Sequence, residues 1–176
     1  MKQTVYRYSI YATITILVLA LLQVTIIASR ASFAVQEAAG YLSMLLSMIF
    51  VFMGIRHYKN KVNGGFLSFG EGLKIGVMIV LLPAVFFGIF DILYTQVIDT
   101  AWADHYYNHV VEEAKRTVAP DKLAAELKKI EEQKEFFGSP AMQFLVMAGT
   151  VFIIGFIVTI ISSLTLMKRK PATTRV

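Results

Sequence analysis

The residues best suited to metal chemistry lie close together in the second half of the chain. They are Asp104, His105, His109, Glu112 and Glu113. His105 and His109 are four residues apart, so they share one face of a helix, and Glu112 or Glu113 follows three or four residues later. Two imidazoles and a carboxylate can bind Zn²⁺. The order is not HExxH and a third fixed ligand is not assured, so we expect a solvated helical face and no metal, with zinc as the alternative.

Two further polar residues lie inside apolar stretches. Asp91 is the only charged residue in its stretch, and Gln23 is strongly polar within another. Asp91 lies 17 residues beyond Lys74, or about 25 Å along a helix. An ionisable group at membrane depth is a candidate functional site. We expect Asp91 near the outer interface, close to Tyr94 and Gln96, as a polar cap, because a proton or ion relay needs a second ionisable partner.

Four apolar stretches must position these side chains. They cover residues 8–29, 38–55, 75–98 and 141–167, with lengths of 22, 18, 24 and 27 residues. A membrane-spanning helix needs about 20 mainly apolar residues. The sequence therefore predicts an all-α polytopic membrane protein that forms a single four-span domain over residues 1–176. A cleaved signal peptide is the alternative for the first stretch, but that stretch exceeds the ~7–15 apolar residues typical of such peptides.

The composition excludes several classes of protein. Hydrophobic residues make up 56% of the 176 residues and charged residues 16%, and the mean hydropathy is +0.62. These values disfavour a water-soluble enzyme, a disordered chain and a nucleic-acid module. The chain contains no cysteine, which excludes disulfides, thiolate metal sites and a cysteine nucleophile.

The charges between the spans predict an orientation. Ten of the 17 basic residues lie before the first span, between the second and third, or after the fourth. They are Lys2, Arg7, Arg56, Lys59, Lys61, Lys74, Lys168, Arg169, Lys170 and Arg175. Residues 99–140 carry nine acids and six bases, a net charge of −3. By the positive-inside rule we expect both termini in the cytoplasm and residues 99–140 outside it.

The outer segment of residues 99–140 is long for a structureless connection. Apolar residues recur at helical spacing in both halves, Pro120 suits a first helical turn, and residues 138–140 (GSP) end the second helix. This pattern predicts a helical hairpin. Its apolar rows either close on each other or form a partner surface of Tyr106, Val110, Leu123, Leu127 and Ile130. Lys128–Glu132 and Glu131–Lys134 are spaced for ion pairs along one helix.

Small and glycine-rich segments predict packing and capping. Gly72 and Gly76 form a GxxxG pair, and Gly155, Thr159 and Ser163 form a row of small residues. Such rows allow close helix contacts, either within one bundle or in a homo-oligomer. Residues 63–72 (NGGFLSFGEG) lack a nucleotide-binding pattern. We expect a turn there, followed by a Ser-x-x-Glu capping box at the start of the third span.

Spans two and three also carry a resemblance. Residues 40–44 (GYLSM), 49–56 (IFVFMGIR), 63–65 (NGG) and 68–76 (SFGEGLKIG) are similar to a family of small four-helix integral membrane proteins of unknown function from Gram-negative bacteria. The helical insert is similar too. The resemblance implies an inner-membrane location, the same four-pass layout and a partner in the envelope. It implies no catalytic residue and no cofactor.

From these features we expect a non-enzymatic interaction or assembly factor that uses its outer hairpin. The hairpin would bind a membrane-protein partner in the envelope or a second copy of the chain, and no nucleic acid or nucleotide. The alternative is a small oligomeric transporter or channel with Asp91 in a polar path. A metal-dependent or intramembrane enzyme is a third possibility.

Overall fold

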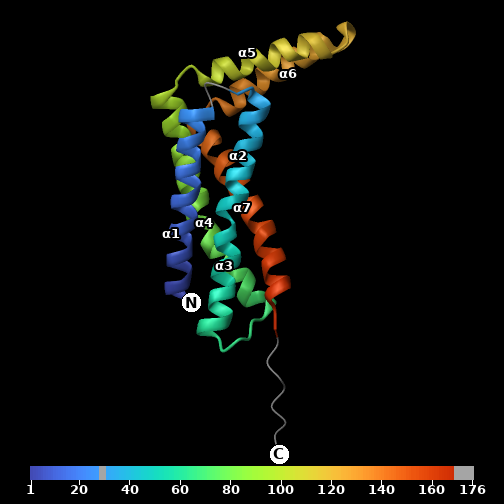
Figure 1. Ribbon diagram of the computed structural model, residues 1–176. Helices are drawn as coiled ribbons and strands as arrows, with labels where there is room; N and C mark the ends of the chain where they lie inside the picture. Colours follow the sequence, from blue (N-terminus) through green and yellow to red (C-terminus); the bar gives the residue numbers. More distant parts are fainter. Residues whose placement is uncertain (28–30, 169–176) are drawn as a thin grey trace, which may run out of the picture. The chain divides into compact units, whose positions relative to one another are not determined.

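Seven α-helices make up most of the chain that the computed structural model describes, which is residues 1–27 and 31–168. They are α1 (Lys2–Leu22), α2 (Phe33–Ser47), α3 (Ile49–His57), α4 (Phe69–Leu93), α5 (Trp102–Thr117), α6 (Pro120–Phe137) and α7 (Pro140–Leu166) (Figure 1). Short π-helical turns follow α1, α3 and α4: η1 (Gln23–Ile27), η2 (Tyr58–Val62) and η3 (Tyr94–Ile98). The predicted end of the first span at residue 29 lies outside the described residues, as do Arg30, Arg169, Lys170 and Arg175.

Within the described residues, four helical stretches are long and apolar enough to cross a membrane. They are Lys2–Ile26, Phe33–Val62, Phe69–Ile98 and Pro140–Leu166. The prediction of four spans is confirmed, and the chain is a multi-pass membrane protein. The first three stretches are longer than predicted, because helices continue through charged residues such as Arg7, Glu37 and Lys74 instead of ending at them.

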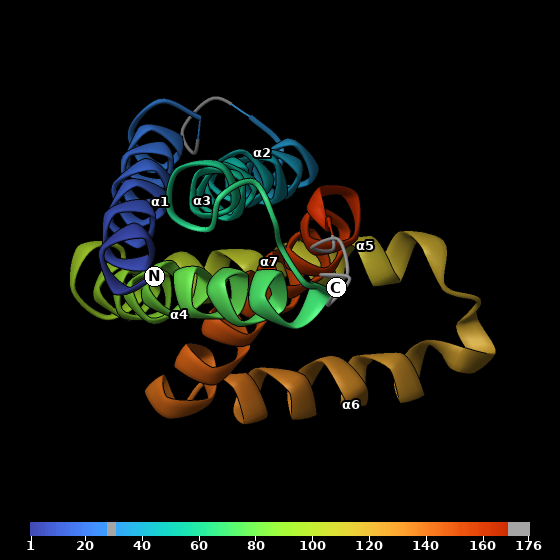
Figure 2. The ribbon, with the colours of Figure 1, turned by 90° about the horizontal axis from the view of Figure 1, so that it is seen from below.

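The chain divides into two compact units. The first contains the residues up to Phe87 together with those from Ala148 onward, and the second contains Gly88–Met147. In the first unit, α1, α2 with α3, the first part of α4 and the last part of α7 lie side by side (Figures 1 and 2). Its core is made of aliphatic side chains from each of these helices, including Ile16, Met48, Val51, Ile79 and Val151.

The outer surface of this first unit is also apolar. Ile14, Leu81, Ile153 and Ile161 are each about half exposed. A water-soluble protein rarely leaves so many large apolar side chains uncovered. A lipid environment removes this cost, since acyl chains are as apolar as these side chains.

Buried hydroxyl groups in the first unit are satisfied by their own helices. Thr13 donates to the carbonyl of Ser9 at 2.8 Å, Thr159 to Gly155 at 2.8 Å and Ser163 to Thr159 at 2.7 Å. Hydrogen bonds back to the preceding turn let small polar residues occupy a site without water. The core can therefore use serine and threonine as small packing residues.

The two rows of small residues pack against each other. A Cβ atom on Gly72 would lie 2.7 Å from Ser163 Oγ, and one on Gly76 would lie 2.3 Å from Thr159 Cγ2. A Cβ on Gly155 would lie 2.5 Å from Val80 Cγ1. These rows therefore serve the α4–α7 contact within one chain, which decides between the two predicted uses for these residues.

The connection between α3 and α4 has the predicted turn and cap. Gly64 and Gly65 have φ values of 61° and 85°, which a residue with a side chain rarely adopts. The Ser68 backbone N–H donates to Glu71 Oε2 at 2.8 Å, and the Glu71 N–H donates to Ser68 Oγ at 3.2 Å. This reciprocal pair is a capping box. The glycine-rich segment thus starts α4.

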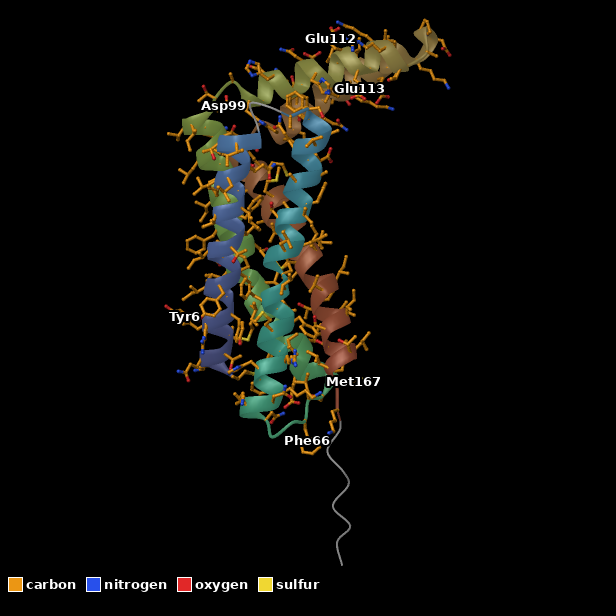
Figure 3. The ribbon with its side chains drawn as sticks, in the orientation of Figure 1. Tyr6, Phe66, Asp99, Glu112, Glu113 and Met167 are labelled. Atoms are coloured by element: carbon orange, nitrogen blue, oxygen red, sulfur yellow. The ribbon has the colours of Figure 1, made fainter. Side chains whose placement is uncertain are left out.

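The same connection is tied to the end of α7. Leu67 and Lys168 exchange two backbone hydrogen bonds of 2.9 and 2.8 Å, and Lys168 Nζ lies 5.8 Å from the centre of the Phe66 ring. Figure 3 shows Phe66 and Met167 at this end of the first unit, where α1 also begins. The first helix, the α3–α4 connection and the end of α7 therefore share one end of the four-helix unit.

The second unit contains the predicted helical hairpin. Pro120 is the first residue of α6, and α7 begins at Pro140. Lys134 of α6 donates to Asp104 Oδ1 of α5 at 2.7 Å, which fixes the two helices in an antiparallel arrangement. Of the predicted Glu131–Lys134 pair only a charge interaction is present, because Lys134 donates its hydrogen bond across to Asp104 instead. The predicted Lys128–Glu132 pair is present at 3.7 Å.

Candidate functional site: a polar cluster at Asp91 and a helical hairpin

Asp91 lies in a polar cluster within the second unit. Thr95 follows one turn later and donates from Oγ1 to the Asp91 carbonyl at 3.0 Å. Gln143, at the start of α7, donates from Nε2 to Thr95 Oγ1 at 2.7 Å and lies beside the Asp91 side chain. The cluster therefore joins the C-terminal end of the third span to the start of the fourth.

One side-chain oxygen of Asp91 is not satisfied by hydrogen bonds in this cluster. Oδ2 is buried and has no hydrogen-bond partner among the described residues. A buried carboxylate oxygen without a partner is costly, because it has lost its water. This oxygen is the acceptor in the cluster that a proton or a small cation could satisfy.

The sequence pattern indicates Asp91 as a candidate site residue but does not indicate its neighbours Thr95 and Gln143. Thr95 lies at i+4 from Asp91, a spacing that places both on one helical face. Gln143 is the polar residue nearest the start of the fourth span, and an antiparallel neighbour brings it level with the end of the third. The spacing of Thr95 and the position of Gln143 are both visible in the sequence, but neither residue carries a charge that would single it out.

Gln23 has a packing role in the first unit. Its Nε2 donates to the carbonyl of Gln36 on α2 at 2.8 Å. Gly40 borders this side chain, and a Cβ there would make an ordinary contact of 3.6 Å with Gln23 Nε2. The amide thus links η1 to α2, and the contact resembles interhelical hydrogen bonds in other membrane bundles.

The histidines and glutamates of α5 are spread over an exposed surface. His109 Nε2 lies 3.9 Å from Glu113 Oε2, and Lys115 donates to Glu112 at 2.8 Å. The Lys115 hydrogen bond lowers the pKa of Glu112 below its ordinary value. Among the described residues, no three His, Cys, Asp or Glu side chains come close enough together to hold a metal ion. Glu112 and Glu113 are labelled on α5 in Figure 3.

The predicted partner surface is partly covered. Ile130 is buried, with 6% of its surface exposed, whereas Tyr106, Val110, Leu123 and Leu127 are half-buried. The rings of Trp102 and Tyr106 stack with centres 5.3 Å apart. Ile130 therefore lies in the closed seam of the hairpin. A half-exposed aromatic and aliphatic margin is formed by Tyr106, Val110, Leu123 and Leu127.

The sequence of this chain matches a known protein family. A family model described as "Protein of unknown function (DUF4199)" matches residues 7–168. The chain belongs to this family. The match extends from the first span, through the hairpin, to the end of the fourth span. No curated protein and no solved structure matches the chain.

Proposed function

We propose that this chain is a bacterial inner-membrane protein that acts as a non-enzymatic interaction or assembly factor. Both termini lie in the cytoplasm and residues 99–140 lie in the periplasm. There the hairpin binds a membrane protein of the envelope or a second copy of the chain.

The paired helices α5 and α6 carry this proposal. They lie between two spans, Lys134 and Asp104 clamp them together, and the clamp leaves Tyr106, Val110 and Leu123 half exposed. A margin of aromatic and aliphatic side chains on a rigid helical pair suits a protein partner better than solvent. Basic residues gather at the end of the first unit that contains the start of α1 and the α3–α4 connection. They support a cytoplasmic location of this end, because cytoplasmic loops are enriched in Lys and Arg.

Photocrosslinking in native membranes tests this function. Probes replace Tyr106 and Leu123 on the margin, and a control probe replaces Glu113 on the charged face of α5. The proposal expects a discrete protein adduct from the two margin positions and none from Glu113, with mass spectrometry naming the partner. Absence of any margin adduct, or equal adducts from all three positions, would contradict it.

A second candidate is a small oligomeric transporter or channel. The unpartnered Asp91 Oδ2 favours it, because a polar path needs a group that can accept a proton or cation. In proteoliposomes, Asp91→Asn would then abolish proton or sodium flux, and Gln23→Ala, remote from the cluster in sequence, would retain it. Equal flux in wild type and Asp91→Asn would contradict this candidate.

A further inference from the structure

A shallow groove, open over most of its extent, lies on the side of the first unit between α1 and α3. It has a volume of about 320 Å³ and is lined by Tyr11, Ile14 and Thr15 of α1 and by Phe50 of α3. The rings of Tyr11 and Phe50 lie 5.8 Å apart. A water molecule occupies ~30 Å³ in the liquid, so the groove has room for a segment of an apolar chain.

Arg7 lies beside this groove, in contact with the lining residue Tyr11. It precedes Tyr11 by one helical turn, and its Nε donates to Tyr11 Oη at 2.8 Å. The Arg7 Cζ atom lies 5.6 Å from the centre of the Tyr11 ring. These contacts orient the guanidinium through Nε, so its two Nη groups are the donors that can bind a phosphate in a bidentate manner.

The charge around Arg7 favours an anion. Exposed bases on α1, α3 and the α3–α4 connection lie at the same end of the first unit: Lys2, Arg56 and Lys61. The acid in the first turn of α4, Glu71, is engaged by Ser68 and Asn63. Basic sites at the ends of transmembrane helices attract anionic lipid headgroups.

We propose that this groove is a binding site for an anionic membrane phospholipid. Arg7 binds the headgroup phosphate, and one acyl chain runs past Tyr11 along Ile14, Thr15 and Phe50. Ile14 and Thr15 lie seven and eight residues beyond Arg7, or roughly 10–12 Å along the helix. That span matches the first part of an acyl chain that descends from an interfacial phosphate.

A lipid fits this groove better than a second copy of the chain. A packed helix is about 10 Å wide and contacts its neighbour over several turns. The groove is lined by four side chains over little more than one turn of α1. Its aromatic walls and single cationic end also match the amphipathic character of one lipid.

Native mass spectrometry of the detergent-solubilised full chain tests the site. The probes are phosphatidylglycerol and phosphatidylcholine with the same acyl chains. We expect phosphatidylglycerol to bind about tenfold more tightly, because both lipids carry the phosphate but only phosphatidylcholine also carries a choline cation, which the basic end of the groove repels. Arg7→Gln removes this preference, and Arg7→Lys retains part of it because the charge remains without the bidentate geometry.

Filling the groove provides a second variant. Ile14→Trp places a large ring in the groove and lowers phosphatidylglycerol binding, whereas Leu81→Trp, at an exposed apolar position of α4, leaves it unchanged. Lys74→Gln, which removes a base outside the groove, also leaves the preference intact. Equal binding of the two lipids, retained preference in Arg7→Gln, or loss of a dimer upon Ile14→Trp without loss of lipid would overturn the proposal.

Discussion

At single glycines, the absence of a side-chain methyl group determines how closely α4 and α7 approach each other. Gly76 faces Thr159, which is β-branched and too short to move aside, whereas a Cβ on Gly149 would meet no atom within 4 Å. Both glycines lie within helices, where alanine is intrinsically the better residue. The same substitution therefore has opposite effects at the two positions.

We expect Gly76→Ala to lower the free energy of unfolding by about 1–3 kcal/mol, because it overpacks the α4–α7 contact. Gly149→Ala is expected to raise it by up to about 1 kcal/mol, since only the helix propensity changes. Denaturation of both variants in the same detergent measures the difference. Equal effects of the two substitutions would contradict the close α4–α7 contact.

At the scale of the element, the capping box determines where α4 starts. Ser68→Ala removes the side-chain acceptor for the Glu71 N–H and is expected to cost about 1 kcal/mol. Ser43→Ala is the matched control, because the Ser43 hydroxyl only donates to the Ala39 carbonyl in the middle of a helix. Detergent unfolding should show a clear loss for Ser68→Ala alone. A comparable loss in both variants would argue against the cap.

The hairpin depends on pH through its cross-helix ion pair. The hydrogen bond from Lys134 lowers the pKa of Asp104, and the same bond to Asp104 raises the pKa of Lys134. The pair therefore contributes fully between ~3.9 and ~10.4, the ordinary pKa values of Asp and Lys. Its contribution is lost as the pH falls through the lowered pKa of Asp104 or rises through the raised pKa of Lys134.

Trp102, the single tryptophan, reports this dependence from α5. Thermal unfolding followed by Trp102 fluorescence should shift to lower temperature between about pH 7 and about pH 2 in the wild type. Lys134→Gln should reduce that shift. Lys129→Gln should keep it, because Lys129 pairs with Glu126 inside α6 and does not join the helices. The side chains are exposed, so the shift is small, and an unchanged shift in Lys134→Gln would contradict the clamp.

The sequence predicts some elements better than others for physical reasons. Four spans and a hairpin follow from long apolar runs, helical spacing, Pro120 and Pro140. The span ends do not, because a helix can carry Arg7 or Lys74 at its exposed end without stopping. The Asp91 cluster and the groove beside Phe50 depend on which helices become neighbours, and a pattern along one chain does not contain that information.

At the scale of the whole molecule, the account rests on the side of the membrane that the hairpin occupies. The bases at the start of α1, around the α3–α4 connection and at the end of α7 predict that this end is cytoplasmic. The hairpin segment then lies outside, where an envelope partner can reach it. If the chain had the opposite orientation in the membrane, the hairpin would face the cytoplasm and could not reach the proposed partner.

The absence of native cysteine makes this orientation directly measurable. Single cysteines replace Lys61 in the α3–α4 connection and Glu132 on α6, both exposed, and intact cells with a permeabilised outer membrane are treated with a membrane-impermeant maleimide. The account predicts labelling of Glu132→Cys in intact cells, and of Lys61→Cys only after the inner membrane is broken. Labelling of Lys61→Cys in intact cells with protection of Glu132→Cys would contradict it.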